Sequence, residues 1–391
     1  ARSEAIMRKG IWEAFDGYDD IARQIEASRE PAKLQSFKAH HPEPYINRLH
    51  PALLTLRVVD IIQETPSAKT LRLVSEDGFL PPFQAGQYIS LFLEVDRVRT
   101  SRPYSISSQP RQIGYYDITV RRLAGGRVSN YLLDHIRVGD RLQSSGPQGH
   151  FYYNPLFHHA TLICIAGGSG ITPFMSMLRE IAECGLDRTV FLFYGNKNMQ
   201  DVIFHAELLR ISERFPRIHY IPVIEKAHGG YTGECGLIDA ELIRKFIPDS
   251  RQCTCYLCGP QGMYDFCTPA LESLGIQKRH IRRELYGPPL NIRNDPGWPA
   301  HVTEDRIFSV KIKNKGTIQA PATVPLLVSL ENNGITPPSI CRSGECSMCR
   351  VKVLTGSVFQ PSGTPVRKSD SVYGYVHACV SYPLEDLEIL L

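Results

Sequence analysis

The chain has 391 residues, which exceeds one ordinary domain and predicts two to four. Its 42% hydrophobic and 21% charged residues are typical of a soluble globular protein, and a net charge of +4 without a dense basic stripe argues against a nucleic-acid partner. No apolar run approaches the roughly 20 residues that span a bilayer. Eleven cysteines and an N-terminus without an apolar signal core favour the reducing cytoplasm over a disulfide framework.

Residues 1–50 are predicted to form a helical extension followed by a linker. Apolar residues from Trp12 to Ile25 recur at roughly helical spacing, and Pro31 ends that pattern because proline does not continue a helix. The proline-rich stretch His40–Pro51 is predicted to be an extended connector. No family motif is apparent in this extension, so the sequence leaves its role open.

Short strands dominate residues 51–155. Apolar or alternating segments lie at residues 56–59, 70–74, 88–93 and 116–120, with Gly, Pro and Asp clusters between them. Strands at this spacing without long helices predict an antiparallel β-barrel. One short helix, near Ser129–His135, is expected to interrupt the series.

The pattern changes over residues 156–290, where apolar strands alternate with helical segments. Strands are expected at residues 161–166, 189–194, 218–224 and 255–258, and helices at residues 173–184 and 207–214. Buried strands that alternate with helices predict an α/β domain with a parallel sheet. Residues 291–303 are rich in Pro and Gly and are predicted to be a linker, which leaves residues 304–391 as a small α+β module.

Four cysteines in this C-terminal module carry the most specific signal. Cys341, Cys346 and Cys349 read C-x4-C-x2-C, and Cys379 follows after 29 intervening residues. This is the plant-type spacing for four thiolates around a [2Fe–2S] cluster, and the small residues of the loop allow the sharp turns that point amide N–H groups at sulfur. The alternative is a zinc site, but zinc ligands usually come as two C-x2-C pairs, and only one such pair is present.

Two motifs in the predicted barrel indicate a flavin. Residues 102–105 read R-P-Y-S, and residues 126–129 read G-R-V-S. Both motifs, at this separation inside a barrel, resemble the flavin-binding signature of the ferredoxin–NADP reductase superfamily. The resemblance implies that Arg102 pairs with a flavin phosphate, which suits the planar fork of donors on a guanidinium. It also implies that Tyr104 stacks on the isoalloxazine and that Ser105 hydrogen-bonds near N5, where hydride arrives.

The second of these motifs bears on which flavin is bound. By the resemblance, Gly126, Val128 and Ser129 hold the flavin pyrophosphate at the start of the short helix, whose N-terminus favours negative charge. The segment is closer to that of FAD-binding members of the superfamily. FAD is therefore the expected flavin, and FMN is the less favoured alternative.

A glycine-rich turn directly follows the predicted strand 161–166 and reads G-G-S-G-I-T-P. Glycines there let the backbone approach a pyrophosphate, although the pattern departs from strict G-x-G-x-x-G. It resembles the nicotinamide segment of the same superfamily, which implies cofactor-binding roles for Gly167, Gly168, Gly170, Thr172 and Pro173. No acid that would grip a ribose 2′-OH follows the next strand at once, since Lys197 comes first and the first carboxylate is Asp201. NADH and NADPH both stay open, with a slight preference for NADH.

A third segment, Cys258-Gly259-Pro260, resembles the C-G-P segment of the superfamily, whose cysteine lies beside the hydride-transfer site. The resemblance thus implies that Cys258 acts with Tyr104 and Ser105 in catalysis and that residues 258–260 contact the nucleotide. Glu284 and Tyr286 resemble the closing E-x-aromatic segment of the superfamily, which lies near the flavin.

A metal site near Cys258 is not expected. Successive residues of a strand face opposite sides. In an extended strand Cys253 and Cys255 would therefore face one side and Cys258 the other.

The whole resemblance runs from about residue 54 to residue 391, in the domain order of phthalate dioxygenase reductase-like proteins. It implies a β-grasp ferredoxin fold for residues 304–391. A nicotinamide gives up two electrons together and a [2Fe–2S] cluster accepts one at a time, so a flavin between them predicts electron flow from NAD(P)H through FAD to the cluster. The expected partner is an electron-accepting metalloprotein such as an oxygenase or monooxygenase.

Two other functions are compatible with the same cofactors: a self-sufficient reductase of a small molecule, and a redox sensor that signals through the cluster. Turnover separates a reductase from a sensor. The sequence names neither the acceptor nor the oligomeric state.

Overall fold

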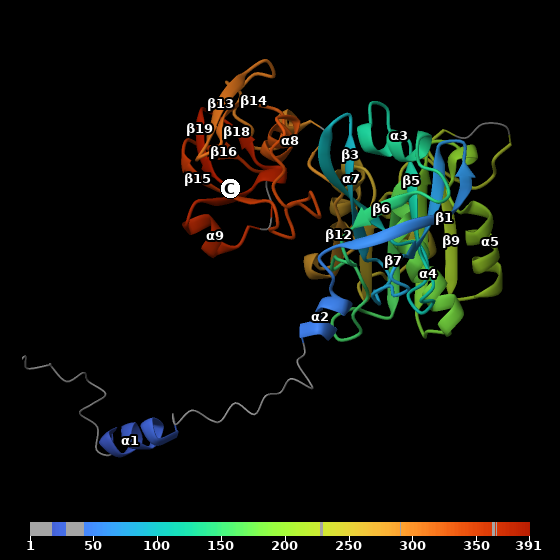
Figure 1. Cartoon of the computed structure of the whole chain (residues 1–391). Coiled ribbons are helices and arrows are strands. Elements are labelled where there is room, and N and C mark those ends of the chain that lie inside the picture. The colour runs from blue at the N-terminus through green and yellow to red at the C-terminus, as the bar shows by residue number, and fades with distance from the viewer. Residues whose placement is uncertain (1–17, 29–42, 227–229, 290, 362–363, 365) are drawn as a thin grey trace, which may run out of the picture. The chain divides into compact units, whose positions relative to one another are not determined.

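The computed structural model describes the chain except for residues 1–17, 29–42, 227–229, 290, 362–363 and 365 (Figure 1). It divides into two compact units, residues 1–48 and residues 49–391. Among the described residues, no helix is both long and apolar enough to cross a membrane.

The N-terminal extension contains α1 (Tyr18–Ser28), and α2 (Glu43–Leu49) follows at the boundary of the two units. The expected helix is confirmed in α1, although Trp12 and Pro31 lie outside the described residues. The prediction that His40–Pro51 is extended is wrong over α2. Pro44 is the second residue of that helix, where a missing N–H leaves no hydrogen bond unmade, so proline is compatible with the first turn.

The first sheet is antiparallel and contains six strands in the order β4-β3-β6-β1-β2-β5. Their bounds are β1 (Leu54–Thr65), β2 (Ala68–Ser75), β3 (Tyr88–Val95), β4 (Val98–Ser105), β5 (Tyr116–Arg121) and β6 (Arg141–Ser144), with α3 (Arg127–Asp134) between β5 and β6. An isolated antiparallel bridge between Ile106 and Ile118 joins the two outer strands. The predicted antiparallel barrel and its one short helix are therefore confirmed.

Apolar residues at every second position of the barrel strands explain this fold. Leu56 and Val58 on β1, Leu71 and Leu73 on β2, and their counterparts on the other strands point into one buried core. Figure 1 shows the ribbons of β1, β3, β5 and β6 gathered beside α3.

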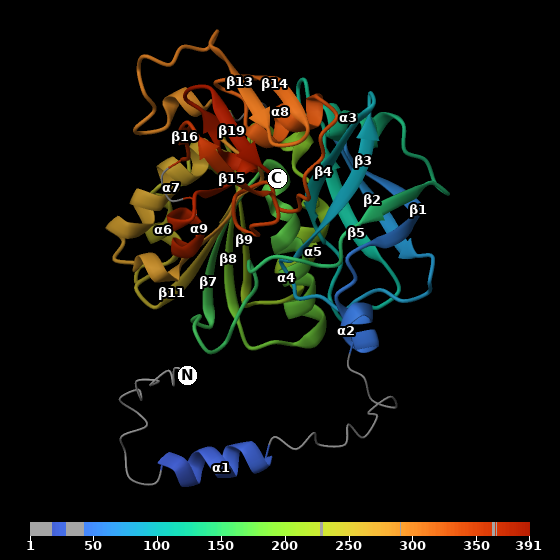
Figure 2. The same ribbon diagram turned by 60° about the vertical axis from the view of Figure 1, so that its left-hand side comes forward.

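The second sheet is parallel, in the order β10-β9-β8-β7-β11-β12. Its strands are β7 (Thr161–Gly167), β8 (Thr189–Asn196), β9 (Ile218–Ile224), β10 (Glu234–Cys235), β11 (Cys253–Cys258) and β12 (Ile281–Glu284), and its helices are α4 (Thr172–Cys184), α5 (His205–Arg214), α6 (Ala240–Phe246) and α7 (Gln261–Ser273). Figure 2 shows β7, β8 and β9 side by side.

Two apolar cores cover the two faces of this parallel sheet. Cys253 and Cys255 belong to one core and Cys258 to the other, as the alternation of strand residues predicted. The strand order reverses between β7 and β11, and this switch point is where open α/β sheets bind their ligands, outside the carboxyl ends of the strands.

The C-terminal module is built on a five-stranded mixed sheet in the order β14-β13-β19-β15-β17, in which β13 and β19 are parallel. Its elements are β13 (Ile307–Ile312), β14 (Gly316–Pro321), α8 (Leu326–Asn332), β15 (Arg350–Thr355), β16 (Val358–Phe359), α9 (Lys368–Val372), β17 (Tyr375–His377), β18 (Tyr382–Pro383) and β19 (Leu387–Leu390). The apolar face of α8 packs on this sheet, which confirms the β-grasp arrangement.

The predicted linker is packed against the C-terminal module. The Trp298 ring makes edge-to-face contacts with Phe359 and Tyr382, and its indole N–H donates to the Val302 carbonyl at 3.1 Å. Val302 and Phe308 complete a small separate apolar core with this ring. The linker is therefore anchored at its tryptophan, which composition alone did not indicate.

Candidate functional site

Arg102 lies on β4 as a largely buried cation without a carboxylate partner among the described residues. Its guanidinium donates to the Thr100 hydroxyl at 2.6 Å and to the Ser101 carbonyl at 2.7 Å. Burial, and then repulsion from Arg342, lower the pKa of Arg102 to about 10. A desolvated guanidinium in this position is incompletely compensated, and an anionic phosphate would supply the missing charge.

Ser105, Cys258 and Tyr286 come together although they lie on different parts of the fold. The hydroxyls of Ser105 and Tyr286 hydrogen-bond to each other, and the Tyr286 hydroxyl also hydrogen-bonds to the Cys258 thiol. Ser105 ends β4 and Cys258 ends β11, and both are buried. Burial raises the pKa of the Cys258 thiol well above its usual value, so this sulfur is a neutral thiol. Tyr286 therefore joins the barrel to the carboxyl edge of the parallel sheet.

The start of α3 offers unused polar groups. The Ser129 hydroxyl and the Asn130 side-chain oxygen are buried, and neither has a hydrogen-bond partner among the described residues. Gly126 precedes the helix, and a Cβ there would lie 2.5 Å from the Ser129 hydroxyl oxygen. Buried polar groups without partners are rare, and a pyrophosphate at this helix N-terminus would satisfy them. Together with the desolvated Arg102, these residues fit a flavin dinucleotide.

The glycine-rich turn after β7 lies directly against the C-G-P segment after β11. A Cβ on Gly170 would overlap the carbonyl oxygen of Cys258, and a Cβ on Gly167 would lie 2.7 Å from the Pro260 ring. Gly168 has φ +54°, a left-handed conformation that favours glycine. The two segments therefore form one continuous floor at the switch point of the sheet, and Thr172 and Pro173 open α4 beside it.

Asp201, the first carboxylate after β8, is bound by the barrel. Its carboxylate accepts hydrogen bonds from the Thr65 hydroxyl at 2.7 Å and the Ser67 hydroxyl at 2.5 Å, and it forms an ion pair with Arg121. Arg121 also lies against Gly168, where a Cβ would overlap its guanidinium. Asp201 thus holds the parallel sheet to the barrel, and its carboxylate is not free to grip a ribose.

The four C-terminal cysteines gather in and beside one loop, residues 339–350, which we call the cluster loop. The Cys341 side chain lies close to those of Cys346 and Cys379, and the Cys379 side chain lies close to that of Cys349, so their titrations are linked. The backbone N–H groups of Ser343 and Cys346 donate to the Cys341 sulfur at 3.4 and 3.3 Å. Such N–H···S contacts are the expected support for thiolates around iron.

The backbone of the cluster loop turns sharply at three positive-φ residues, Arg342 at +57°, Gly344 at +86° and Ser347 at +60°. Within the described part of the chain, no three His, Cys, Asp or Glu side chains converge as ligands of one metal ion. A two-iron cluster needs only two thiolates per iron, so four cysteines linked in this way fit a [2Fe–2S] group.

The cluster loop packs against the flavin-motif face of the barrel. The Ser90 hydroxyl of β3 donates to the Ile340 carbonyl at 2.7 Å, and the Ser101 and Ser339 hydroxyls hydrogen-bond at 2.8 Å. Burial, and then the neighbouring Cys341 and Cys346 side chains, raise the pKa of Tyr88 on β3. The barrel residues that touch the cluster loop thus lie on β3 and β4, and β4 carries the R-P-Y-S motif.

A buried ion pair fixes this contact. Arg342 of the cluster loop donates to both carboxylate oxygens of Glu331 on α8, at 2.6 and 3.0 Å, and the two side chains are 5% and 3% exposed. The Thr100 hydroxyl of β4 donates to the same carboxylate at 3.1 Å. Because Thr100 also accepts from Arg102, one chain of hydrogen bonds runs from the flavin-motif arginine to the cluster loop.

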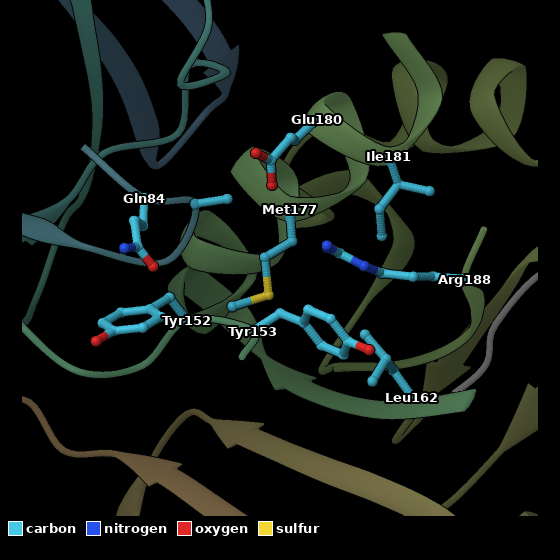
Figure 3. Close-up of a pocket in the computed structure, with 9 residues that line it drawn as sticks. Gln84, Tyr152, Tyr153, Leu162, Met177, Glu180, Ile181 and Arg188 are labelled. Carbon is cyan, nitrogen blue, oxygen red and sulfur yellow. The ribbon is translucent and has the colours of Figure 1, made fainter. Parts of the chain in front are cut away.

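Figure 3 shows a cavity between the segment at Gln84 and helix α4 of the α/β domain, with a volume of about 140 Å³. The thioether of Met177 on α4 points between the rings of Tyr152 and Tyr153, and Arg188 stacks over Tyr153 at 3.8 Å. None of the site residues predicted from the sequence lines this cavity.

Glu284, the acid of the E-x-aromatic segment that ends in Tyr286, ends β12 and is 4% exposed. Its pKa is raised well above its usual value by burial and then by Glu345 and Cys341, so it lies between the nucleotide side and the cluster loop. Glu331 and Arg342 had no signal in the sequence, because an ion pair between a helix and a loop has no periodicity that a sequence pattern can reveal.

A flavin-type barrel, a nucleotide-type sheet and a four-cysteine module on one chain make an NAD(P)H-dependent iron–sulfur flavoprotein reductase. Three family models match in this order: the oxidoreductase FAD-binding domain over residues 56–153, the oxidoreductase NAD-binding domain over residues 164–268, and the 2Fe-2S iron-sulfur cluster binding domain over residues 310–384. The cofactors are accordingly FAD, NADH or NADPH, and a [2Fe–2S] cluster.

Similar proteins match this chain along almost their whole lengths. The NADH oxidoreductase HCR of Escherichia coli is 30% identical over 335 residues, which cover 85% of this chain and 96% of that protein. The glycine betaine monooxygenase reductase subunit of Chromohalobacter salexigens is 29% identical over 348 residues, covering 85% and 94%. The structure of phthalate dioxygenase reductase matches with a TM-score of 0.62 and 25% identity, covering 87% and 97%. The chain belongs to the ferredoxin–NADP reductase superfamily, in the group with a C-terminal plant-type [2Fe–2S] domain.

Proposed function

We propose that this chain is the reductase component of a two-protein oxygenase or monooxygenase system and passes electrons from NAD(P)H to a separate metalloenzyme. Similar proteins include reductase components of a glycine betaine monooxygenase and of a 3-ketosteroid-9-alpha-monooxygenase. All eleven cysteines of this chain are free, and a cytoplasmic location remains our prediction from their number.

One observation carries the proposal: the strand that holds the flavin motif, β4, and its neighbour β3 both contact the cluster loop. In the register of β3 and β4, Tyr88 pairs with Ser105 and Leu91 pairs with Arg102. Neighbouring strands lie about 4.8 Å apart, and Ser90 on β3 bonds the cluster loop directly. A flavin, when bound, takes two electrons from a nicotinamide and releases them singly, which is what a one-electron cluster requires.

On the flavin side, Arg102 would bind a phosphate, and Gly126, Val128 and Ser129 would hold the pyrophosphate at the start of α3. Tyr104 would stack on the flavin ring. Ser105, held in place by its bond to Tyr286, would present its hydroxyl to the ring.

On the nucleotide side, Cys258 would lie at the meeting point of nicotinamide and flavin, since it contacts Tyr286 and is neutral. The floor formed by Gly167, Gly168, Gly170, Thr172, Pro173, Gly259 and Pro260 would exclude water beneath the nucleotide. Cys341, Cys346, Cys349 and Cys379 would be the four ligands of the cluster.

Arg102→Ala is expected to weaken flavin binding by roughly 10- to 150-fold, the loss of a charged hydrogen-bond partner worth about 1.5–3 kcal/mol. Fluorescence titration of flavin-free protein with FAD measures this affinity. Arg99→Ala is the matched control, because Arg99 lies on the same strand but pairs with Glu94 at the surface. Equal affinities in the two variants would remove Arg102 from the flavin site.

Cys258→Ala is expected to leave flavin and iron bound and to slow flavin reduction by NAD(P)H by about 10- to 100-fold, because a small misplacement at a reacting centre is costly. Stopped-flow absorbance at the flavin band measures the rate. Cys255→Ala is the control, since Cys255 is equally buried on the same strand but faces the opposite core. A similar slowing in both variants would point to packing of β11 as the cause.

The proposed function is tested by isolating the acceptor and rebuilding the system. Immobilised chain with both cofactors bound should retain an iron-containing oxygenase from its own cells, and the pair should couple NAD(P)H oxidation to hydroxylation. The chain alone should reduce ferricyanide rapidly, which a redox sensor need not do. Full NAD(P)H-dependent conversion of a small substrate by the chain alone would favour a self-sufficient reductase instead.

A further inference from the structure

A second cavity of about 610 Å³ lies at the edge strand β12 and serves none of the roles above. Its polar lining is basic: His150, His158, Arg279, His280 and Arg282 face it, and no carboxylate is among the described residues that line it. We call this cavity the basic pocket. It lies toward the amino ends of the parallel strands, because His280 directly precedes β12 and His158 lies just before β7. It is therefore separate from the nucleotide floor at the carboxyl ends.

No carboxylate lines the basic pocket or pairs with its arginines among the described residues. Within the described part of the chain, neither Arg279 nor Arg282 forms an ion pair; Arg279 donates to the His280 ring at 3.2 Å and Arg282 to the His150 carbonyl at 3.3 Å. The Nδ1 atom of His280 is buried and has no partner there. Cations and donors that face a cavity without acceptors favour an anionic occupant.

The floor of the basic pocket is rigid. The Asn154 N–H donates to the His158 Nδ1 atom at 2.9 Å, and the Tyr256 hydroxyl lies 2.6 Å from the same nitrogen. Burial, and then Arg282 and His280, lower the pKa of His158 to about 4, so this imidazole is neutral at pH 7. The two arginines of the basic pocket thus stand beside a neutral imidazole on a preformed surface.

The rim of the basic pocket is apolar and exposed. Leu156 and Phe157 are 83% and 70% exposed, and both belong to the lining. A small hydrophilic anion would leave these side chains in water. An acidic protein segment with apolar residues would cover them, and buried aromatic residues beside arginine are typical anchors of protein interfaces.

Strand β12 leads from the basic pocket toward the barrel strands that contact the cluster loop. Arg282 lies on β12, Tyr286 just after that strand hydrogen-bonds to Ser105 of β4, and Ser101 of β4 hydrogen-bonds to Ser339 of the cluster loop. A protein held in the basic pocket would therefore stand near the loop from which electrons leave.

We propose that the basic pocket binds an acidic segment of the protein that accepts electrons from the cluster. The proposal rests on the proposed function and adds the chemistry by which the partner is recognised. The partner carries a carboxylate-rich segment that faces Arg279 and Arg282 and an apolar side chain that covers Phe157.

The test uses the full chain with both cofactors bound and two protein acceptors of opposite charge, the acidic soluble cytochrome b5 and the basic cytochrome c. Arg279→Glu should raise KM for cytochrome b5 roughly tenfold at low salt, and the effect should vanish near 1 M salt, where the Debye length is about 3 Å. Phe157→Ser should raise it roughly fivefold at both salt concentrations, because an apolar contact is not screened. Both side chains are exposed, so neither variant disturbs a core.

Arg210→Glu is the matched control, because Arg210 is an exposed arginine on α5 whose guanidinium donates to the Ala206 carbonyl of its own helix. This variant should change KM for cytochrome b5 by less than about twofold, which is a smaller change than the loss of one interface contact causes. Reduction of cytochrome c should not weaken in Arg279→Glu, and NADH-to-ferricyanide turnover should be equal in all variants.

Three results would overturn the proposal. Equal KM values for cytochrome b5 in Arg279→Glu and Arg210→Glu would show that the pocket does not bind an acidic protein, while the proposed function would stand. Saturable binding of phosphate or citrate that Arg279→Glu abolishes, without any change in cytochrome b5 kinetics, would assign the pocket to a small anion. A chain that reduces ferricyanide but no protein acceptor would remove the proposed function and this partner together.

Discussion

Cys346→Ser is expected to separate two electron-transfer activities of this chain. A serine oxygen is a harder and poorer ligand for iron–sulfur clusters than a thiolate, so the cluster should be lost or become labile. The barrel and the parallel sheet have their own apolar cores and should still bind FAD and NAD(P)H. NAD(P)H-to-ferricyanide turnover should therefore survive. The rate of electron transfer to a protein acceptor should fall by more than about 10-fold, because changes around a metal site typically reduce activity by at least that factor.

Iron analysis and parallel assays with ferricyanide and cytochrome c measure this separation. Cys235→Ser is the control, since Cys235 is an exposed free cysteine in the α/β domain. Equal loss of both activities would show that the reductase core needs an intact ferredoxin module to fold. Equal retention of both would place the cluster outside the electron path.

Glu331→Gln is expected to loosen the cluster loop from the barrel. The change leaves the Arg342 guanidinium buried without its countercharge, and breaking one side of a buried ion pair costs about 3–5 kcal/mol. It also removes the anion that lies between Arg342 and Arg102, whose mutual repulsion already lowers the pKa of Arg102. The cluster should be lost at a lower temperature, and electron transfer from flavin to cluster should slow more than flavin reduction does.

Thermal loss of the cluster absorbance and rapid-mixing kinetics measure these effects. Glu241→Gln on α6 is the control, because that carboxylate is exposed. A double variant, Glu331→Leu with Arg342→Met, should regain part of the lost stability, since two apolar side chains leave no buried charge unpaired. Identical cluster stability in Glu331→Gln and Glu241→Gln would mean that the ion pair does not hold the loop.

The domain plan could be predicted from sequence because each part has a local signature. Strand alternation indicated the barrel, alternating strands and helices indicated the parallel sheet, and the spacing of Cys341, Cys346 and Cys349 indicated the cluster module. These signals arise from backbone periodicity and from the geometry of turns, both of which act over a few residues.

Contacts between distant segments could not be predicted in the same way. The Asp201–Arg121 pair and the Glu331–Thr100 hydrogen bond join residues whose neighbours in the sequence give no hint of a partner. Asp201 is the first carboxylate after β8 and was not assigned a role from sequence, and only the fold shows that barrel hydroxyls hold it. The short helix α2 was missed because Pro44 lies within it and Pro42 and Pro51 flank it in the sequence, although Pro44 occupies a position where proline is tolerated.

The anchored linker gives the protein a built-in optical reporter. The chain has two tryptophans, Trp12 and Trp298, and Trp298 stands among the rings of Phe359 and Tyr382. In a Trp12→Phe background, its emission would come from this one residue, and undocking of the linker would expose the indole to water and shift its emission to longer wavelength. Release of the linker from the ferredoxin module could then be followed in real time, without any label, while the enzyme turns over.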